Sequence, residues 1–156
     1  MVEAGRGKLT RTMNATEFLR KLDPKSVVDA IRGAESQTTG EIRVFVSRHA
    51  TTDVSVDARR QFDALKLHKT TDRNAVLFYF VPGNQQFAIV GDTGIHSRVG
   101  ADFWPTVSAQ ISERLRAGEI TAAVVEGIQR VGNELATHFP SANGGRNEFP
   151  DSIERD

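Results

Sequence analysis

The spacing of hydrophobic positions changes along the chain and outlines an alternation of helices and strands. Alternating residues at 41–47 predict a strand, and the almost continuous apolar run 75–81 predicts a strand covered on both faces. Pro82-Gly83-Asn84 marks a turn, after which 86–90 is expected to pair back as a hairpin. Apolar residues three or four positions apart predict helices near 14–22, 24–34, 53–65, 102–117 and 120–138. This order predicts an α/β fold with helices on both faces of a mixed β-sheet.

The length fits one domain with two polar ends. A chain of 156 residues can bury one hydrophobic core but is too short for two. Patterning is weak before residue 14, and Ser141-Ala142-Asn143-Gly144-Gly145 is typical of a linker. We therefore expect a flexible N-terminus at 1–13, a folded domain at 14–140, and a linker with a polar C-terminal tail at 141–156.

Composition excludes several classes of function. The 20 basic and 20 acidic residues cancel, and no basic stripe with interleaved aromatics favours nucleic acid as a partner. The absence of cysteine excludes disulfides, thiolate metal sites and enzymes with a cysteine nucleophile. No apolar run reaches the roughly 20 residues of a membrane span, and the N-terminus lacks the apolar core of a signal peptide. We therefore expect a soluble, cytoplasmic protein.

Oxygen-bearing side chains are predicted to meet at one edge of the sheet. Strands 41–47 and 75–81 are joined through a helix and should run parallel, whereas 86–90 returns antiparallel. The start of the first two strands and the end of the third then share an edge. Carboxylate and amide oxygens suit a hard cation such as Ca²⁺ or Mg²⁺, and a cation would relieve repulsion between neighbouring carboxylates. The candidate ligands are Asp92, Glu41, Asn74 and Asp72.

Each candidate ligand also has a local structural interpretation. Glu41 can serve as a charge on an edge strand, Asp72 as a turn residue, and Asp92 as a helix cap. Under that interpretation the edge binds no ion tightly, and the chain is an interaction domain whose partner is a protein.

A hydrolase would need further groups beside the metal. A phosphate needs a positive partner, and Arg73, Arg98 and Arg43 are the nearby candidates. Of the four histidines, His96 alone neighbours the predicted site and is the candidate acid or base. The triplet Asp92-Thr93-Gly94 also imitates the aspartic-protease signature, but that chemistry needs two such carboxylates in a mostly β framework. Phosphate-loop, nucleophile-elbow and dinucleotide motifs are absent, and no catalytic residue can be assigned.

The same residues resemble the TPM domain family. The resemblance runs from about Lys25 to Phe139 and extends in the tail to Asn147-Glu148-Phe149-Pro150-Asp151, which is similar to a stand-alone bacterial branch of the family. The motifs that carry it are Thr39-Gly40-Glu41-Ile42-Arg43-Val44, Arg73-Asn74-Ala75-Val76-Leu77, Gly91-Asp92-Thr93-Gly94-Ile95 and Val124-Val125-Glu126-Gly127-Ile128.

This resemblance implies a three-layer αβα sandwich, divalent-cation binding at the sheet edge and, in some members, an acid phosphatase activity. Glu41, Asn74 and Gly94 match family positions, whereas His96 stands where most members show an acidic residue. Many members carry a membrane helix that this chain lacks, which implies a free cytoplasmic module.

Three functions follow as hypotheses. The first is a cation-binding module acting in stress or envelope maintenance through a protein partner. The second is a metal-dependent phosphomonoesterase, in which the cation polarises a phosphoryl oxygen and activates water. The third is an interaction domain with no tight ligand. Glu148 and Asp151 would add ligands if the tail folds back over the site.

Overall fold

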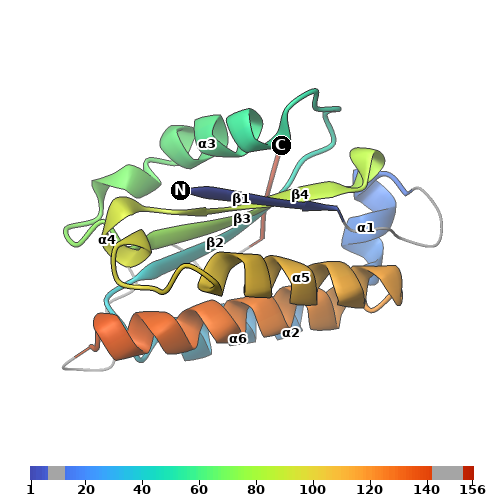
Figure 1. Cartoon of the computed structure of the whole chain (residues 1–156). Coiled ribbons are helices and arrows are strands. Elements are labelled where there is room, and N and C mark those ends of the chain that lie inside the picture. The colour runs from blue at the N-terminus through green and yellow to red at the C-terminus, as the bar shows by residue number, and fades with distance from the viewer. Residues whose placement is uncertain (7–12, 142–152) are drawn as a thin grey trace.

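The protein is a three-layer αβα sandwich built on a mixed five-stranded sheet (Figure 1). The computed structural model of the chain describes residues 1–6, 13–141 and 153–156. The sheet has the order β1-β4-β3-β2-β5. Its strands are β1 (Val2–Arg6), β2 (Glu41–Val46), β3 (Ala75–Val81), β4 (Gln86–Gly91) and β5 (Ile153–Arg155). Strands β2 and β3 are parallel and β3 and β4 antiparallel, which confirms the expected arrangement.

Helices cover both faces of this sheet, as Figure 1 shows. Helix α3 lies on one face, and α2, α5 and α6 lie on the other. The helices are α1 (Ala15–Lys21), α2 (Pro24–Glu35), α3 (Val54–Ala64), α4 (Thr93–His96), α5 (Phe103–Arg116) and α6 (Ile120–His138). Two short 3₁₀ turns, η1 (Leu67–Lys69) and η2 (Pro82–Asn84), complete the described elements. No helix among the described residues is long and apolar enough to cross a membrane.

Local sequence accounts for several helix boundaries. The side chains of Asn14 and Asp53 accept hydrogen bonds from the first turns of α1 and α3 and so cap them. Pro24 occupies the first position of α2, where its missing N–H costs no hydrogen bond. Gly118 ends α5 with φ of 77°, a left-handed conformation that favours glycine.

Alternation along the central strands divides the apolar residues between two cores, one on each face of the sheet, where the chain length predicted one. Ile42, Val44 and Val46 of β2 face the larger core under α1, α2, α5 and α6. Phe45 faces the smaller core under α3. The same alternation places Glu41 and Arg43 on the α3 side of β2.

Two segments form strands inside the ranges expected to be a flexible N-terminus (1–13) and a linker with a polar tail (141–156). Val2–Arg6 lacks a strand-like alternation, yet it pairs antiparallel with β4, and Gly5 lies so close to Phe87 that an added Cβ would be 2.4 Å from its ring. Ile153–Arg155 pairs parallel with β2. Both segments gain backbone partners from strands that would otherwise form sheet edges. Residues 7–12 and 142–152, including Glu148 and Asp151, lie outside the described part of the chain.

Candidate functional site

The sheet topology brings three of the predicted positions to one edge. Glu41 is the register partner of Ala75, and the backbone N–H of Asp92 donates to the Ala75 carbonyl at 3.0 Å. Ala75 therefore lies between Glu41 and Asp92, and Asn74 directly precedes it. The Cα atoms of Glu41 and Asp92 are two strand spacings apart, about 10 Å. The predicted convergence of positions at this edge is confirmed.

Asp92 is fully buried, and both of its carboxylate oxygens have partners. Oδ2 accepts from Nε of Arg73 at 2.7 Å, and Oδ1 accepts from Nη2 of Arg73 at 2.8 Å. Oδ1 also accepts from the backbone N–H of Thr93 at 2.8 Å, which makes Asp92 the cap of α4. This two-pronged geometry gives a strong, oriented ion pair. The hydrogen bond and charge of Asp92 raise the pKa of the Arg73 guanidinium above its ordinary value.

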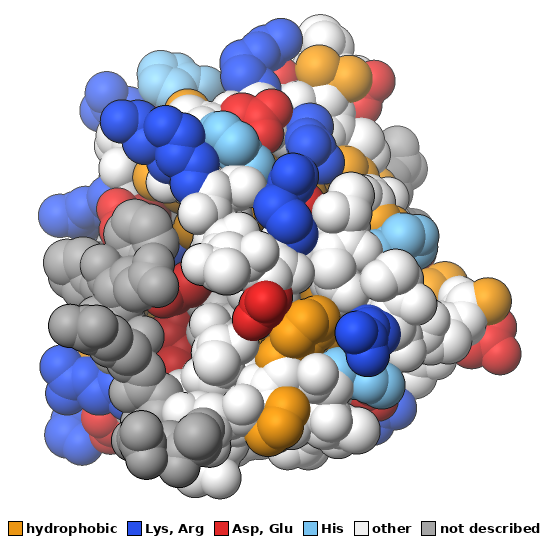
Figure 2. All heavy atoms as spheres, turned by 90° about the vertical axis from the view of Figure 1, so that its left-hand side faces the viewer, with side chains coloured by type: hydrophobic (Ala, Val, Ile, Leu, Met, Phe, Trp, Pro, Cys, Tyr) orange, Lys and Arg blue, Asp and Glu red, His pale blue; other side chains and the backbone are white. Residues whose placement is uncertain are grey.

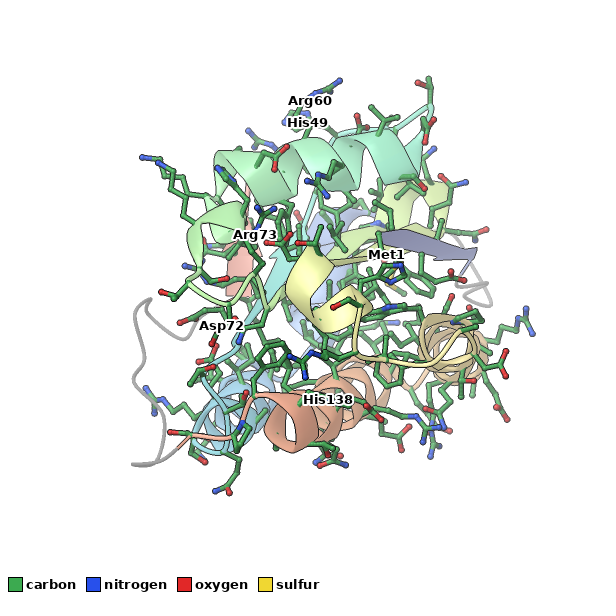
Figure 3. All side chains as sticks on the ribbon, turned by 60° about the vertical axis from the view of Figure 1, so that its left-hand side comes forward. Met1, His49, Arg60, Asp72, Arg73 and His138 are labelled. Atoms are coloured by element: carbon green, nitrogen blue, oxygen red, sulfur yellow. The ribbon has the colours of Figure 1, made fainter. Side chains whose placement is uncertain are left out.

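The two members of this pair differ in exposure. The Asp92 side chain is 0% exposed, whereas that of Arg73 is 44% exposed. Arg73 has φ of 51° and lies on the loop beside α4, as does Asp72 (Figure 3). Seen from this end of the molecule, Lys and Arg side chains gather on the α3 side of the surface (Figure 2). The carboxylate is thus fixed inside the fold, while its counter-charge stands at the surface.

The loop that carries Arg73 packs tightly against the start of α4. The Arg73 carbonyl accepts hydrogen bonds from the N–H groups of Gly94 and Ile95, at 2.8 and 3.3 Å. A Cβ at Gly94 would lie 2.0 Å from the Asp72 carbonyl oxygen, so glycine is required there by the close approach of two backbones. This contact gives a physical reason for the glycine in the Asp92-Thr93-Gly94 motif.

Asn74 provides a buried oxygen atom without a hydrogen-bond partner. Its side chain is almost completely buried, and its Nδ2 donates to Oγ1 of Thr39 at 3.1 Å. The Thr39 hydroxyl in turn donates to Oδ2 of Asp72 at 3.3 Å. Within the described residues, Oδ1 of Asn74 has no hydrogen-bond partner. A buried carbonyl oxygen left unpaired is costly, so such an atom calls for a partner such as a water molecule or an ion.

The other two predicted ligands differ in accessibility. Glu41 is buried at the start of β2, whereas Asp72 is exposed. Over the described ranges, no three His, Asp or Glu side chains come close enough to hold a metal ion. The positions therefore converge without forming a coordination shell, and Arg73 occupies the carboxylate that such a shell would need. The ligand set Asp92, Glu41, Asn74 and Asp72 stays a prediction.

The structure separates the three candidate phosphate-binding arginines. Arg73 is bound to Asp92. Arg98 is exposed, and its guanidinium lies 5.8 Å from the centre of the Phe139 ring. Arg43 lies inside β2 and pairs with Glu154 of β5, which places it along the strand and not at the site. His96 is exposed at the last position of α4, and its acid–base role stays a prediction.

Sequence reasoning missed the threonines of this site. Thr39 bridges Asn74 and Asp72, and Thr70 accepts the backbone N–H of Asn74 at 3.1 Å. Both are short polar residues next to predicted strands, a signal too common to single them out. The pairing of Arg73 with Asp92 was also missed, because nothing in the local sequence indicates that the two side chains meet.

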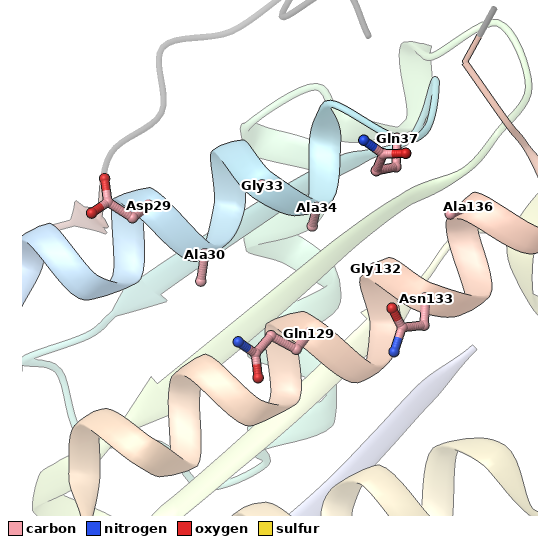
Figure 4. A pocket seen from close by; sticks show the side chains of 9 residues that line it. All are labelled: Asp29, Ala30, Gly33, Ala34, Gln37, Gln129, Gly132, Asn133 and Ala136. Carbon is pink, nitrogen blue, oxygen red and sulfur yellow. The ribbon is translucent and has the colours of Figure 1, made fainter. Parts of the chain in front are cut away.

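A groove between α2 and α6 lies in the helical layer (Figure 4). Its walls are largely small side chains, among them Ala30, Gly33, Ala34, Gly132 and Ala136. None of the predicted site residues lines it. The groove therefore adds nothing to the site at the strand ends.

Comparisons with known proteins agree with this architecture. The sequence profile of the TPM domain matches residues 13–134. The NMR structure of BA42 protein from the psychrophilic bacterium Bizionia argentinensis is 35% identical, with a TM-score of 0.79 over 96% of this chain and 99% of that one. The N-terminal domain of cg2496 from Corynebacterium glutamicum shares the fold at 12% identity, with a TM-score of 0.51 over 86% of this chain and 82% of that one. A comparison with curated proteins found no match. The chain belongs to the TPM domain family.

Proposed function

We propose that the strand edge at Asp92 binds a divalent cation, Ca²⁺ or Mg²⁺, and that the cation competes with Arg73 for the Asp92 carboxylate. The observation that carries this proposal is the buried, unpartnered Oδ1 of Asn74, the residue that follows Arg73 in the chain. Amide and carboxylate oxygens are the ligands that both ions prefer. Asp92 and Asn74 would hold the ion, with Asp72 and Glu41 as further oxygen ligands.

The burial of the Asp92–Arg73 pair supports a competition. A fully buried carboxylate needs a positive partner, because an unpaired charge in the protein interior is strongly unfavourable. Arg73 supplies that partner now, but its half-exposed side chain can turn into water at little cost in solvation. A divalent cation would take over the neutralising charge. Arg73 is therefore an internal counter-ion of Asp92 that an external cation could replace.

Thermal unfolding in chelator, Ca²⁺ or Mg²⁺ tests this proposal on the wild-type chain and on Arg73→Gln. Binding to the native state alone must raise the unfolding midpoint by mass action. We expect a saturable rise for the wild type. For Arg73→Gln we expect a lower midpoint in chelator and a larger rise with the cation, because the competitor has been removed.

The matched control is Arg98→Gln, which removes an exposed arginine that stacks on Phe139 and leaves Asp92 untouched. Its cation response should equal that of the wild type. The proposal fails if neither ion raises the midpoint of the wild type or of Arg73→Gln. It also fails if Arg73→Gln lowers the midpoint without increasing the response, since Arg73 would then be a structural partner alone.

A phosphomonoesterase activity is the second candidate, and the two-pronged guanidinium of Arg73 favours it. Once a cation holds Asp92, that guanidinium would be available for a phosphate oxygen pair, which matches its geometry. The bound cation would supply Lewis-acid polarisation of the phosphoryl group. Cation-dependent hydrolysis of an aryl phosphate that Arg73→Gln abolishes would support this function. Hydrolysis that survives Arg73→Gln would contradict it.

A further inference from the structure

A second set of charged contacts fastens the C-terminal strand to the sheet, independently of the Asp92 edge. Strand β5 pairs in parallel with the second half of β2, with Val44 opposite Ile153 and Val46 opposite Arg155. Ile153 packs against the larger core. Alternation then directs Glu154 and Asp156 to the opposite side of the strand, toward the face that carries Arg43 and Ser47.

The first polar contact joins Arg43 to Glu154. Nη1 of Arg43 donates to Oε1 of Glu154 at 2.5 Å. Here the positive member is buried, with 7% of its side chain exposed, and the negative member is 31% exposed. A buried guanidinium is thus aimed from the sheet at a carboxylate on an added strand. Arg43 is therefore fixed inside the central sheet, whereas its partner Glu154 lies partly at the surface.

The second contact holds Asp156 just beyond the end of β2. The Ser47 hydroxyl donates to Oδ2 of Asp156 at 2.7 Å, and the Arg48 backbone N–H donates to Oδ1 at 3.0 Å. Nε2 of His49 lies 3.8 Å from the same carboxylate. Burial alone would raise the pKa of Asp156, but these hydrogen bonds and the charges of His49 and Arg48 outweigh it and lower the pKa. The ionised carboxylate is therefore the form bound.

The fold orients the Ser47 hydroxyl to bind the Asp156 carboxylate. Its side chain is buried, and its Oγ accepts the backbone N–H of His49 at 3.1 Å. That bond uses one lone pair of the hydroxyl oxygen, while the hydroxyl proton is donated to Asp156. Together with Arg43 and the Arg48 N–H, it forms a receptor for two carboxylates on one side of an extended segment. Those carboxylates are two residues apart, as on a strand.

We propose that the edge of β2 from Arg43 to Arg48 is a docking site for an extended acidic segment of a partner protein, with residues 153–156 as its resident ligand. The fitting pattern is an apolar residue, an acidic residue, any residue and a second acidic residue, as in Ile153-Glu154-Arg155-Asp156. Strand addition supplies backbone hydrogen bonds, and alternate side chains supply specificity. The resident strand is only three residues long, which makes exchange with a longer strand feasible.

Competition with a labelled peptide tests this inference on the full chain. The probe is a fluorescent Ser-Ile-Glu-Arg-Asp peptide, which copies residues 152–156. The double variant Glu154→Gln/Asp156→Asn weakens the resident ligand and leaves the receptor intact. By fluorescence anisotropy we expect this variant to bind the peptide at least tenfold more tightly than the wild type. The matched control peptide, Ser-Ile-Gln-Arg-Asn, should bind at least tenfold more weakly than the probe.

Receptor variants then locate the binding. Adding Arg43→Gln or Ser47→Ala to the double variant should weaken peptide binding at least tenfold, and the Arg48 amide resonance should shift with peptide in the double variant. Near-ultraviolet circular dichroism of the Ser47→Ala form confirms that its fold is retained. The proposal is overturned if the double variant does not bind the peptide, or binds it no better than the wild type. It is also overturned if the wild type dimerises by exchanging β5, because the site would then serve a second copy.

Discussion

Two arginine–carboxylate pairs lie on the same sheet, Arg73 with Asp92 at the ends of the central strands and Arg43 with Glu154 between β2 and β5. They differ in which member of the pair is buried. In the first pair the carboxylate is inside and the guanidinium is near water. In the second the guanidinium is inside and the carboxylate is near water. Each pair therefore has one fixed charge and one that could be replaced by a ligand of the same sign.

The difference indicates which ligand each region can accept. Separating a pair penalises its buried member most, because that charge loses its compensation in a poorly solvated place. Under the proposed cation binding, the Asp92 edge would release Arg73 when another cation arrives. Under the proposed peptide docking, the β2 edge would release Glu154 when another carboxylate arrives. One sheet thus presents a candidate cation site and a candidate acidic-peptide site, and neither depends on the other.

The largest expected effect concerns the rigidity of the Asp92 edge. Gly94→Ala places a Cβ 2.0 Å from the Asp72 carbonyl, so the loop of Arg73 must move. We expect a loss of about 3 kcal/mol in the free energy of unfolding, measured in urea. Gly100→Ala is the control, since a Cβ there meets nothing within 4 Å. Equal stability of the two variants would show that the Arg73 loop is not held by this contact.

The next effect concerns the β2 edge. Glu154→Ala removes the carboxylate opposite the buried Arg43 guanidinium, and we expect a loss of about 1–2 kcal/mol. Replacing both members, as Arg43→Met/Glu154→Leu, should cost less than the sum of Arg43→Met and Glu154→Leu measured singly. A double-mutant cycle in urea measures this coupling. Strict additivity would contradict the pairing.

The smallest effect is a pH dependence at Asp156. Its folded-state pKa lies below the ordinary value of 3.8, so its contribution to stability is present above pH 3.8 and is lost as the pH falls through the folded pKa. Because the carboxylate is partly exposed, the change should stay below about 1 kcal/mol. The Arg48 amide resonance should follow this titration, and Asp156→Asn should remove it. An Arg48 resonance that stays constant in acid would count against the contact.

The sequence predicted the central elements well because they carry strong periodic signals. The run Ala75–Val81 and the hairpin turn at Pro82-Gly83-Asn84 specify β3 and β4 almost to the residue. The terminal strands were missed because β1 and β5 are specified by the free edges of β4 and β2 and carry little periodicity of their own. Whether such segments form strands depends on partners that lie far away in the sequence.

The same limit applies to the site. The predicted strand directions were enough to place Glu41, Asn74 and Asp92 at the same end of the sheet. They could not show that Arg73 turns back through a left-handed backbone to bind Asp92, because the predicted pattern fixes positions and not side-chain directions. That contact changes the interpretation of the edge from an open acidic cluster to a carboxylate already neutralised.

NMR titration of the ¹⁵N-labelled chain with Ca²⁺ or Mg²⁺ tests most directly whether a cation displaces Arg73 from Asp92. The Nε–H of Arg73 donates to Asp92 Oδ2, and the Thr93 amide donates to Oδ1, so both signals report on this carboxylate. We predict that the Arg73 Nε–H signal weakens or shifts to the position of a solvated arginine, with a saturable shift at Thr93. Unchanged Arg73 and Thr93 signals at saturating cation would contradict the claim.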